Sequence, residues 1–325
     1  GGNYNTVVGD EAGTAITTGD SNVAVGYTAL DATTTASNNT AVGFAALTIN
    51  VTGAQNTAVG GYALYNNEAS DNTGLGYNAL FTNTTGTNNT AVGKDALVAN
   101  TTGDTNTALG YLALDANTTA SNNTAVGASA LTANTTGTQN AAVGAEAMDA
   151  NTTGNTNAAL GIGALGSNTT ASNNTAVGAF ALLANTTGAE NTAVGRSALL
   201  ANTTANDNTA VGYAALVANT TGAENTGIGK SSLDANTTAT QNTGIGYDSL
   251  GGTTTGGENV GLGHSALVAN TTGNENTAVG KEALASSVAA DRNTAVGYRA
   301  LRVCNPSGNV DMYNVAMGYS AGVAV

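Results

Sequence analysis

The chain has 325 residues, of which 9% are charged and 41% hydrophobic, and its formal net charge is −14. This acidic balance, without any basic run, argues against nucleic acid and anionic membrane surfaces as partners. No apolar run approaches the roughly 20 residues of a membrane span, and a single cysteine, Cys304, excludes an internal disulfide framework.

A seventeen-residue unit repeats nineteen times from Asn5 onward, and we number its positions as columns starting from its first Asn. The consensus is Asn-Thr-Ala-Val-Gly-x-x-Ala-Leu-x-Ala-Asn-Thr-Thr-Gly/Ala-x-x. Such fixed-period self-similarity is typical of solenoids, in which each unit contacts mainly its neighbours. We expect residues 1–325 to form a single elongated repeat domain. Because the chain starts at Gly1 without Met and stops inside a repeat, we also expect it to be part of a longer polypeptide.

Each unit predicts one short strand. A segment of four or five residues, enriched in Thr and Val, precedes an obligatory Gly, which favours a strand over a helix. Helical repeats need about 33 to 47 residues to fit their helices. We therefore predict an all-β fold, a parallel β-solenoid or β-roll of about 19 coils of 17 residues.

Column five is Gly in all nineteen units, from Gly9 to Gly318. Only backbone geometry demands this: either a positive φ or a corner where a Cβ would collide with the next coil. We expect the column to form a structural corner of every coil. Its central members are Gly93, Gly110, Gly127, Gly144, Gly161, Gly178, Gly195 and Gly212.

The predicted core consists of columns four and nine. Column four is always aliphatic, and column nine is Leu in sixteen units and Met148 in another. Gly13 and Gly322 occupy column nine in the first and last units, so the terminal coils should have a thinner interior.

Column three is expected to face outward, because side chains alternate along a strand and column four is assigned to the core. It is Ala or Gly in every unit except the first, which has Val7. An outward stripe without charge or long side chains predicts a close-approach surface, either for another chain or for a flat ligand. The predicted oligomer interface contains Ala58, Ala91, Ala108, Ala125, Ala142, Ala176, Ala193 and Ala210.

The charged residues predict the solvent face. All seven basic residues and nineteen of the twenty-one acidic ones fall in columns six, seven, ten, sixteen and seventeen; Glu68 and Asp311 are the exceptions. Two coils are irregular: 56–71 lacks one residue and 293–313 has four extra, both after the Ala-Leu pair. Insertions map to the loop-bearing side of repeats, so the segment from Asn to Leu should be the rigid wall.

Columns one and twelve are rich in Asn, and column fourteen is rich in Thr. Coils about 4.8 Å apart let identical amides hydrogen-bond along the stack. We predict two such ladders. The Asn-Thr-Thr segments at Asn83, Asn100 and Asn117 also match a glycosylation acceptor, but the ladder explains them sufficiently.

The sequence offers little for catalysis, and we expect neither an enzyme nor a bound cofactor or metal. His264 and Cys304 are the only residues of their kinds and lie in no recognisable constellation. Column-seventeen carboxylates such as Glu190 and Glu224 are expected to form a solvated acidic edge rather than a calcium site. The seven Tyr of column six either stack on sugars or cover the corner beside Gly, and we favour the second interpretation.

The motif Asn-Thr-Ala-Val-Gly-x-x-Ala, as at Asn89 to Ala96 and Asn191 to Ala198, resembles the head repeats of trimeric autotransporter adhesins. Asn-Thr-Ala-Val-Gly-Tyr before Ala-Leu, at Asn293 to Leu301, is similar to repeats of phage tail-fibre and related surface proteins. The resemblance implies a left-handed parallel β-roll, trimeric association, and an extracellular role as a shaft or adhesive head.

Two functional hypotheses follow, both without an enzymatic step. The first is a structural or adhesive fibre on a virion or cell surface, formed by a homo-oligomer or by end-to-end filament growth, with a host glycan or protein as a possible further partner. The second is an ice-binding solenoid with a Thr/Ala face. The adjacent Thr residues of columns thirteen and fourteen should point to opposite faces, which weakens the second hypothesis.

Overall fold

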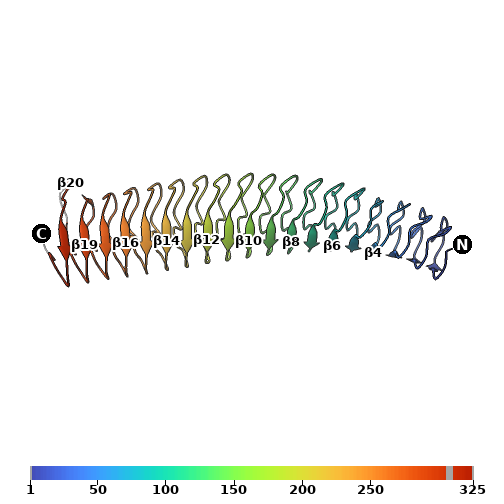
Figure 1. Cartoon of the computed structure of the whole chain (residues 1–325), viewed down its shortest axis with the longest axis horizontal. Coiled ribbons are helices and arrows are strands. Elements are labelled where there is room, and N and C mark those ends of the chain that lie inside the picture. Colours follow the sequence, from blue (N-terminus) through green and yellow to red (C-terminus); the bar gives the residue numbers. More distant parts are fainter. Residues whose placement is uncertain (1, 305–309, 324–325) are drawn as a thin grey trace. The chain divides into compact units, whose positions relative to one another are not determined.

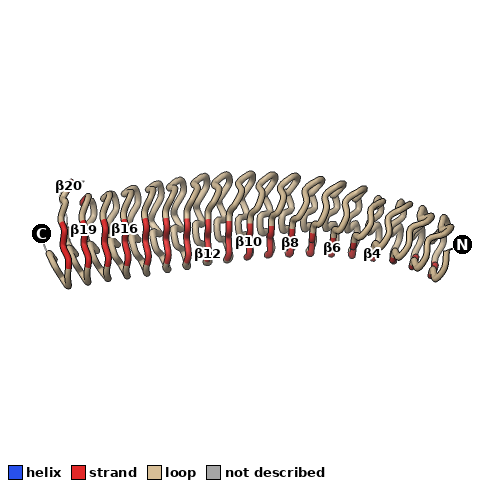
Figure 2. The backbone as a smooth tube through the Cα atoms, viewed as in Figure 1, coloured by secondary structure: helices blue, strands red, loops and turns tan. Residues whose placement is uncertain are grey.

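The computed structural model describes residues 2–304 and 310–323, and in these residues it contains strands and turns but no helix. Two compact units make up the chain, Gly1–Ile162 and Gly163–Val325. Both are built from the same coil, a three-residue strand followed by a run of turns (Figures 1 and 2). The predicted all-β parallel solenoid with a repeat of about 17 residues is confirmed.

In the first unit, ten strands pair in parallel, each with the strand of the next coil. The register never slips, so that Thr90, Ala91 and Val92 lie opposite Thr107, Ala108 and Leu109. The strands are β1 (Thr6–Val8), β2 (Val23–Val25), β3 (Thr40–Val42), β4 (Thr57–Val59), β5 (Thr73–Leu75), β6 (Thr90–Val92), β7 (Thr107–Leu109), β8 (Thr124–Val126), β9 (Ala141–Val143) and β10 (Ala158–Leu160).

The second unit repeats this arrangement and adds one short parallel pair, β18 with β20. The strands are β11 (Thr175–Val177), β12 (Thr192–Val194), β13 (Thr209–Val211), β14 (Thr226–Ile228), β15 (Thr243–Ile245), β16 (Val260–Leu262), β17 (Thr277–Val279), β18 (Ala290–Asp291), β19 (Thr294–Val296), β20 (Val310–Asp311) and β21 (Val315–Met317).

The interior of a coil is narrow. The Leu side chains of column nine fill it, and Leu30 to Leu284 are fully buried, as predicted. The small side chains of columns three and eight, such as Ala91 and Ala96, are fully buried with them. A Cβ added to Gly74 in column three would already lie 3.1 Å from Cγ of Leu64 in the preceding coil, so this position has room for Ala and nothing larger.

The predicted orientation of the strand is therefore wrong. Column three points inward and columns two and four point outward, because the interior selects for small size rather than for hydrophobicity. The alanines expected at an oligomer interface are fully buried within their own chain and cannot contact another one. They are Ala58, Ala91, Ala108, Ala125, Ala142, Ala176, Ala193 and Ala210.

The glycine corner is confirmed on both of its predicted grounds. Column-five φ values lie far in the positive region, for example 134° at Gly93, 144° at Gly110, 136° at Gly161 and 134° at Gly195. A Cβ on Gly110 would also lie 2.4 Å from the carbonyl oxygen of Gly127 in the next coil. The same φ range holds at Gly127, Gly144, Gly178 and Gly212.

Both Asn ladders are present. In column twelve, Nδ2 of Asn117 donates to Oδ1 of Asn100 at 2.9 Å and to the carbonyl of Ala120 in its own coil. In column one, Oδ1 of Asn89 accepts from the backbone N–H of Asn106 at 2.9 Å. These amides are buried, so the Asn side chain of each Asn-Thr-Thr segment lies inside the coil, whereas column-fourteen residues such as Thr102 are exposed.

Three non-glycine columns adopt the left-handed conformation in coil after coil. In the coil around β6 these are Asn88, Asp95 and Leu97, with φ values of 59°, 57° and 52°. Asn and Asp tolerate this region, whereas Leu does so rarely. The buried contacts of column nine hold Leu in a backbone conformation that its residue type would not predict.

The shorter of the two irregular coils absorbs its length change in the turn after column twelve. Asn67 donates to the carbonyl of Ala69, two residues on, where regular coils use a residue three positions on. Glu68 thus replaces the usual Thr-Thr pair. In the longer coil, pairing of β18 with β20 places Asp311 opposite Asp291, in column sixteen. The extra residues follow Cys304, in a stretch that includes 305–309, outside the described residues.

Candidate functional site

The outward side of the strands is the most regular surface of each unit. We call it the strand face and define it as the side chains of columns two and four. In the first unit it extends from β1 to β10, and none of its side chains is buried. Neither column carries a charged residue in any coil. The face is therefore a two-column array of Thr and aliphatic side chains.

Aliphatic groups are unusually exposed on this face. Leu75, Leu109 and Leu160 in column four are 44%, 45% and 51% exposed. Monomeric proteins rarely leave long contiguous apolar stretches in water, and such stretches often mark sites of interaction. The charge-free outward columns are therefore two and four, and not column three.

The hydroxyl groups of the coil fall into two classes. In column thirteen, Thr84 and Thr101 each donate to the carbonyl of the same column in the next coil, at 3.0 Å. In column two, Thr90 and Thr107 have no side-chain hydrogen bond within the described residues. The column-two hydroxyls are available to solvent or to a ligand.

An aromatic cluster lies beside the face in the first unit. Tyr27 stacks on Phe44 with centroids 5.4 Å apart, and Tyr62 contacts Phe44, Tyr65 and Tyr77 edge to face. The column-six rings of this cluster stay exposed, with Tyr27 at 45%, Phe44 at 49% and Tyr77 at 50%.

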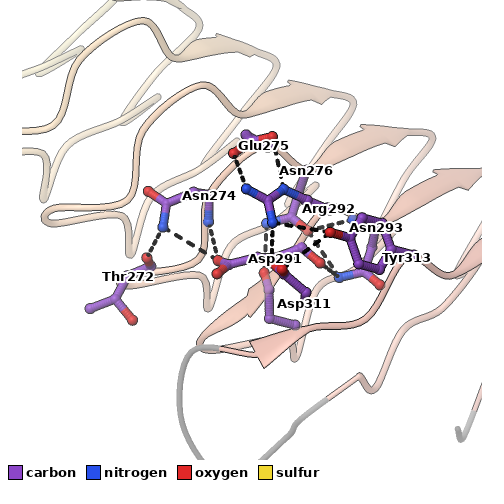
Figure 3. Close-up of polar contacts among 10 residues, drawn as sticks. Thr272, Asn274, Glu275, Asn276, Asp291, Arg292, Asn293, Asp311 and Tyr313 are labelled. Carbon is purple, nitrogen blue, oxygen red and sulfur yellow. Dashed lines mark hydrogen bonds and ion pairs between the residues drawn. The ribbon is translucent and has the colours of Figure 1, made fainter.

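In the second unit an ionic cluster connects consecutive coils. Nη2 of Arg292 lies 3.0 Å from Oε1 of Glu275, and Nη1 pairs with Asp311 (Figure 3). The hydroxyl of Tyr313 accepts from Nη1 of Arg292 at 3.2 Å. Asn274 donates its backbone N–H to Asp291 in the same view. The cluster ties the coil with the insertion to the preceding coil.

The remaining reactive groups form no recognisable catalytic arrangement. Exposed His264 stacks on Tyr247 at 5.0 Å, and its Nδ1 lies 3.0 Å from Oγ of Ser265. Cys304 is buried in column twelve, where burial raises the pKa of its thiol. Among the described residues, no group of three or more His, Cys, Asp or Glu is arranged to hold a metal ion.

No protein-family model matches this chain, and no curated protein has a similar sequence.

The charged side chains lie on the outside of the coils. Within residues 2–304 and 310–323, no Asp, Glu, Lys or Arg is buried, which confirms the predicted solvent columns. The column-seventeen carboxylates Glu190, Glu224 and Glu258 are exposed, as expected for a solvated edge. No helix in the described residues is long and apolar enough to cross a membrane. The alternation that was expected to turn column three outward would also place the Thr of column two inside, whereas the structure places these Thr on the strand face.

Proposed function

We propose that the chain is a non-enzymatic structural protein, a segment of a shaft or head in an extracellular fibre on a virion or cell surface. The observation that carries this proposal is the unchanging interior. The same Leu, Ala, Gly and Asn columns recur in both units, whereas the variable residues lie on the outside. A repeated scaffold with a variable surface suits a load-bearing or spacing element.

The resemblance of the repeats to adhesin heads and tail fibres supports the same proposal. From this resemblance we expect a left-handed β-roll that assembles as a trimer, and an end-to-end filament is the alternative assembly. Since the column-three alanines are internal, contacts between copies must use other columns. Light scattering on the purified chain measures the assembly directly, because a trimer, a monomer and a filament differ widely in mass.

The fibre proposal is tested by immunogold labelling of the cells or virions that produce the protein. Antibodies against column-seventeen epitopes around Glu224 and Glu258, which are exposed, should label surface fibres without permeabilisation. Labelling confined to the cell interior would contradict the proposal. Antibodies against an unrelated surface protein and an unrelated interior protein of the same source serve as controls.

A further inference from the structure

The strand face of the first unit is richest in Thr at its centre. From β3 to β8, six consecutive coils carry Thr in column two and Val or Leu in column four. Parallel pairing keeps the six hydroxyls in one row and the aliphatic groups in another. The hydroxyl row contains Thr40, Thr57, Thr73, Thr90, Thr107 and Thr124.

This array is rigid before anything binds to it. Thr and Val are β-branched and have few χ1 choices. Beneath them, the buried Asn ladders and the fully buried Leu97 and Leu114 fix each coil against the next. A ligand with the same period can therefore be held without a large ordering cost.

Three properties of the face limit the ligand. Its groups recur at the spacing of parallel strands, about 4.8 Å, so a matching ligand must be periodic. The face has no charge, which excludes a mineral or polyanion held by ion pairs. It has no aromatic ring, so it lacks the stacking platform on which a polysaccharide would rest.

A second copy of the chain is one periodic candidate. Packing two such faces together would take the six hydroxyls out of water, and each one left unpaired would cost about 1–3 kcal/mol. A lattice of water molecules can instead hydrogen-bond to every hydroxyl. The neighbouring methyl groups restrict the orientation of water in the first shell, which favours an ordered arrangement.

We propose that the strand face from β3 to β8 binds the ordered water lattice of an ice surface. This function goes beyond the proposed fibre role and requires only that the face stays uncovered. The Thr hydroxyls of column two hydrogen-bond to lattice water, and the column-four side chains fill the spaces between them. This face carries Thr with Val or Leu, whereas the sequence had led us to expect an ice-binding face of Thr and Ala.

The test compares full-length variants that differ in one face only. Thr90→Lys with Thr107→Lys places two charges in the centre of the array. Thr102→Lys with Thr119→Lys places the same charges in the same two coils on exposed column-fourteen positions. Thermal hysteresis and the incorporation of each protein into a slowly grown ice crystal are measured, and light scattering gives its mass.

We expect the unmodified chain and the column-fourteen variant to show hysteresis and to enter the ice. The column-two variant should lose both while circular dichroism and the unfolding transition remain those of the unmodified chain. Absence of hysteresis and of incorporation in the unmodified chain would overturn the inference, as would equal losses in both variants. An oligomer that the column-two variant converts to monomers would show that copies cover the face, which overturns ice binding but leaves the fibre proposal intact.

Discussion

The two units have the same interior but differ in columns six and seventeen, which lie beside the strand face and which we call its rim. Beside the strand face, columns six and seventeen carry three charged residues in Gly1–Ile162, which are Asp10, Asp71 and Lys94. In Gly163–Val325 the same columns carry nine, with acidic groups mainly in column seventeen and basic ones in column six. Aromatic rings cluster in the first unit, whereas ion pairs connect coils in the second. The surface thus differs between the units while the core does not, and the smaller number of charges in columns six and seventeen leaves the first unit's face the better candidate for binding uncharged water.

The largest expected effect concerns the interior that the units share. Ala91→Glu and Ala193→Glu each place a carboxylate where the wild-type side chain is fully buried beside Leu. We expect each to lower the free energy of unfolding by more than about 4 kcal/mol, because a buried unpaired charge adds to overpacking. Urea unfolding with hydrogen exchange should locate equal losses in the two units.

The controls for these variants lie one residue away on the same strands. Thr90→Glu and Thr192→Glu carry the same charge on outward side chains and should change the unfolding free energy by less than about 1 kcal/mol. If the outward variants unfold the protein and the inward ones do not, the orientation of the strand is wrong.

The next effect concerns the corner. In Gly110→Ala the new Cβ would lie 2.4 Å from the carbonyl oxygen of Gly127, and the residue would have to keep a φ of 144°. In Gly212→Ala the new Cβ would lie 2.5 Å from the carbonyl oxygen of Gly229, at a φ of 136°. We expect each substitution to cost about 3 kcal/mol, since such backbone conformations are nearly restricted to Gly. Thermal unfolding measures the loss, and Gly61→Ala, where the nearest atom is a Tyr77 ring carbon at 3.4 Å, is the control.

A smaller effect depends on pH. Burial raises the pKa of Asp115, and its Oδ1 is buried without a hydrogen-bond partner in the described residues. The folded protein therefore binds this proton more tightly than the unfolded chain, and stability falls as pH rises from the ordinary Asp pKa through the raised value. Asp115→Asn should raise the melting temperature at pH 7 and leave it nearly unchanged below the ordinary Asp pKa. A melting temperature raised equally at both pH values would contradict the assigned cause.

Much of this fold could be predicted because its determinants repeat. An invariant Gly implies a backbone constraint, and stacked Asn implies a ladder, so Gly110 and Asn100 were assigned correctly. The position of the length changes followed from the same pattern. Periodicity alone was enough for these features, because each depends on contacts between identical columns.

The orientation of the strand could not be deduced from hydrophobicity. Val92 is more hydrophobic than Ala91, yet it lies outside, because the column-nine Leu of the preceding coil closely approaches column three, as Leu64 does at Gly74. One signal was present in the sequence. Column eight holds Ser instead of Ala at Ser232 and Ser249, and column three of the next coil then holds Gly, at Gly244 and Gly261 respectively. A Cβ added to either Gly would lie 2.7 Å from Oγ of the Ser in the preceding coil. This pairing of sizes indicates that the two columns face each other inside the coil.

The smallest expected effect concerns the charged rim of the second unit. Arg292→Gln removes the pairs with Glu275 and Asp311, whose side chains are each 44% exposed. Exposed ion pairs contribute little to stability and are screened by salt. We therefore expect a small fall in melting temperature at low ionic strength that disappears in high salt, with faster hydrogen exchange confined to the last coils. Asn88→Gln, in the same column of the first unit, removes no ion pair and should show no salt dependence. If both variants respond equally to salt, the ionic cluster does not distinguish the second rim from the first.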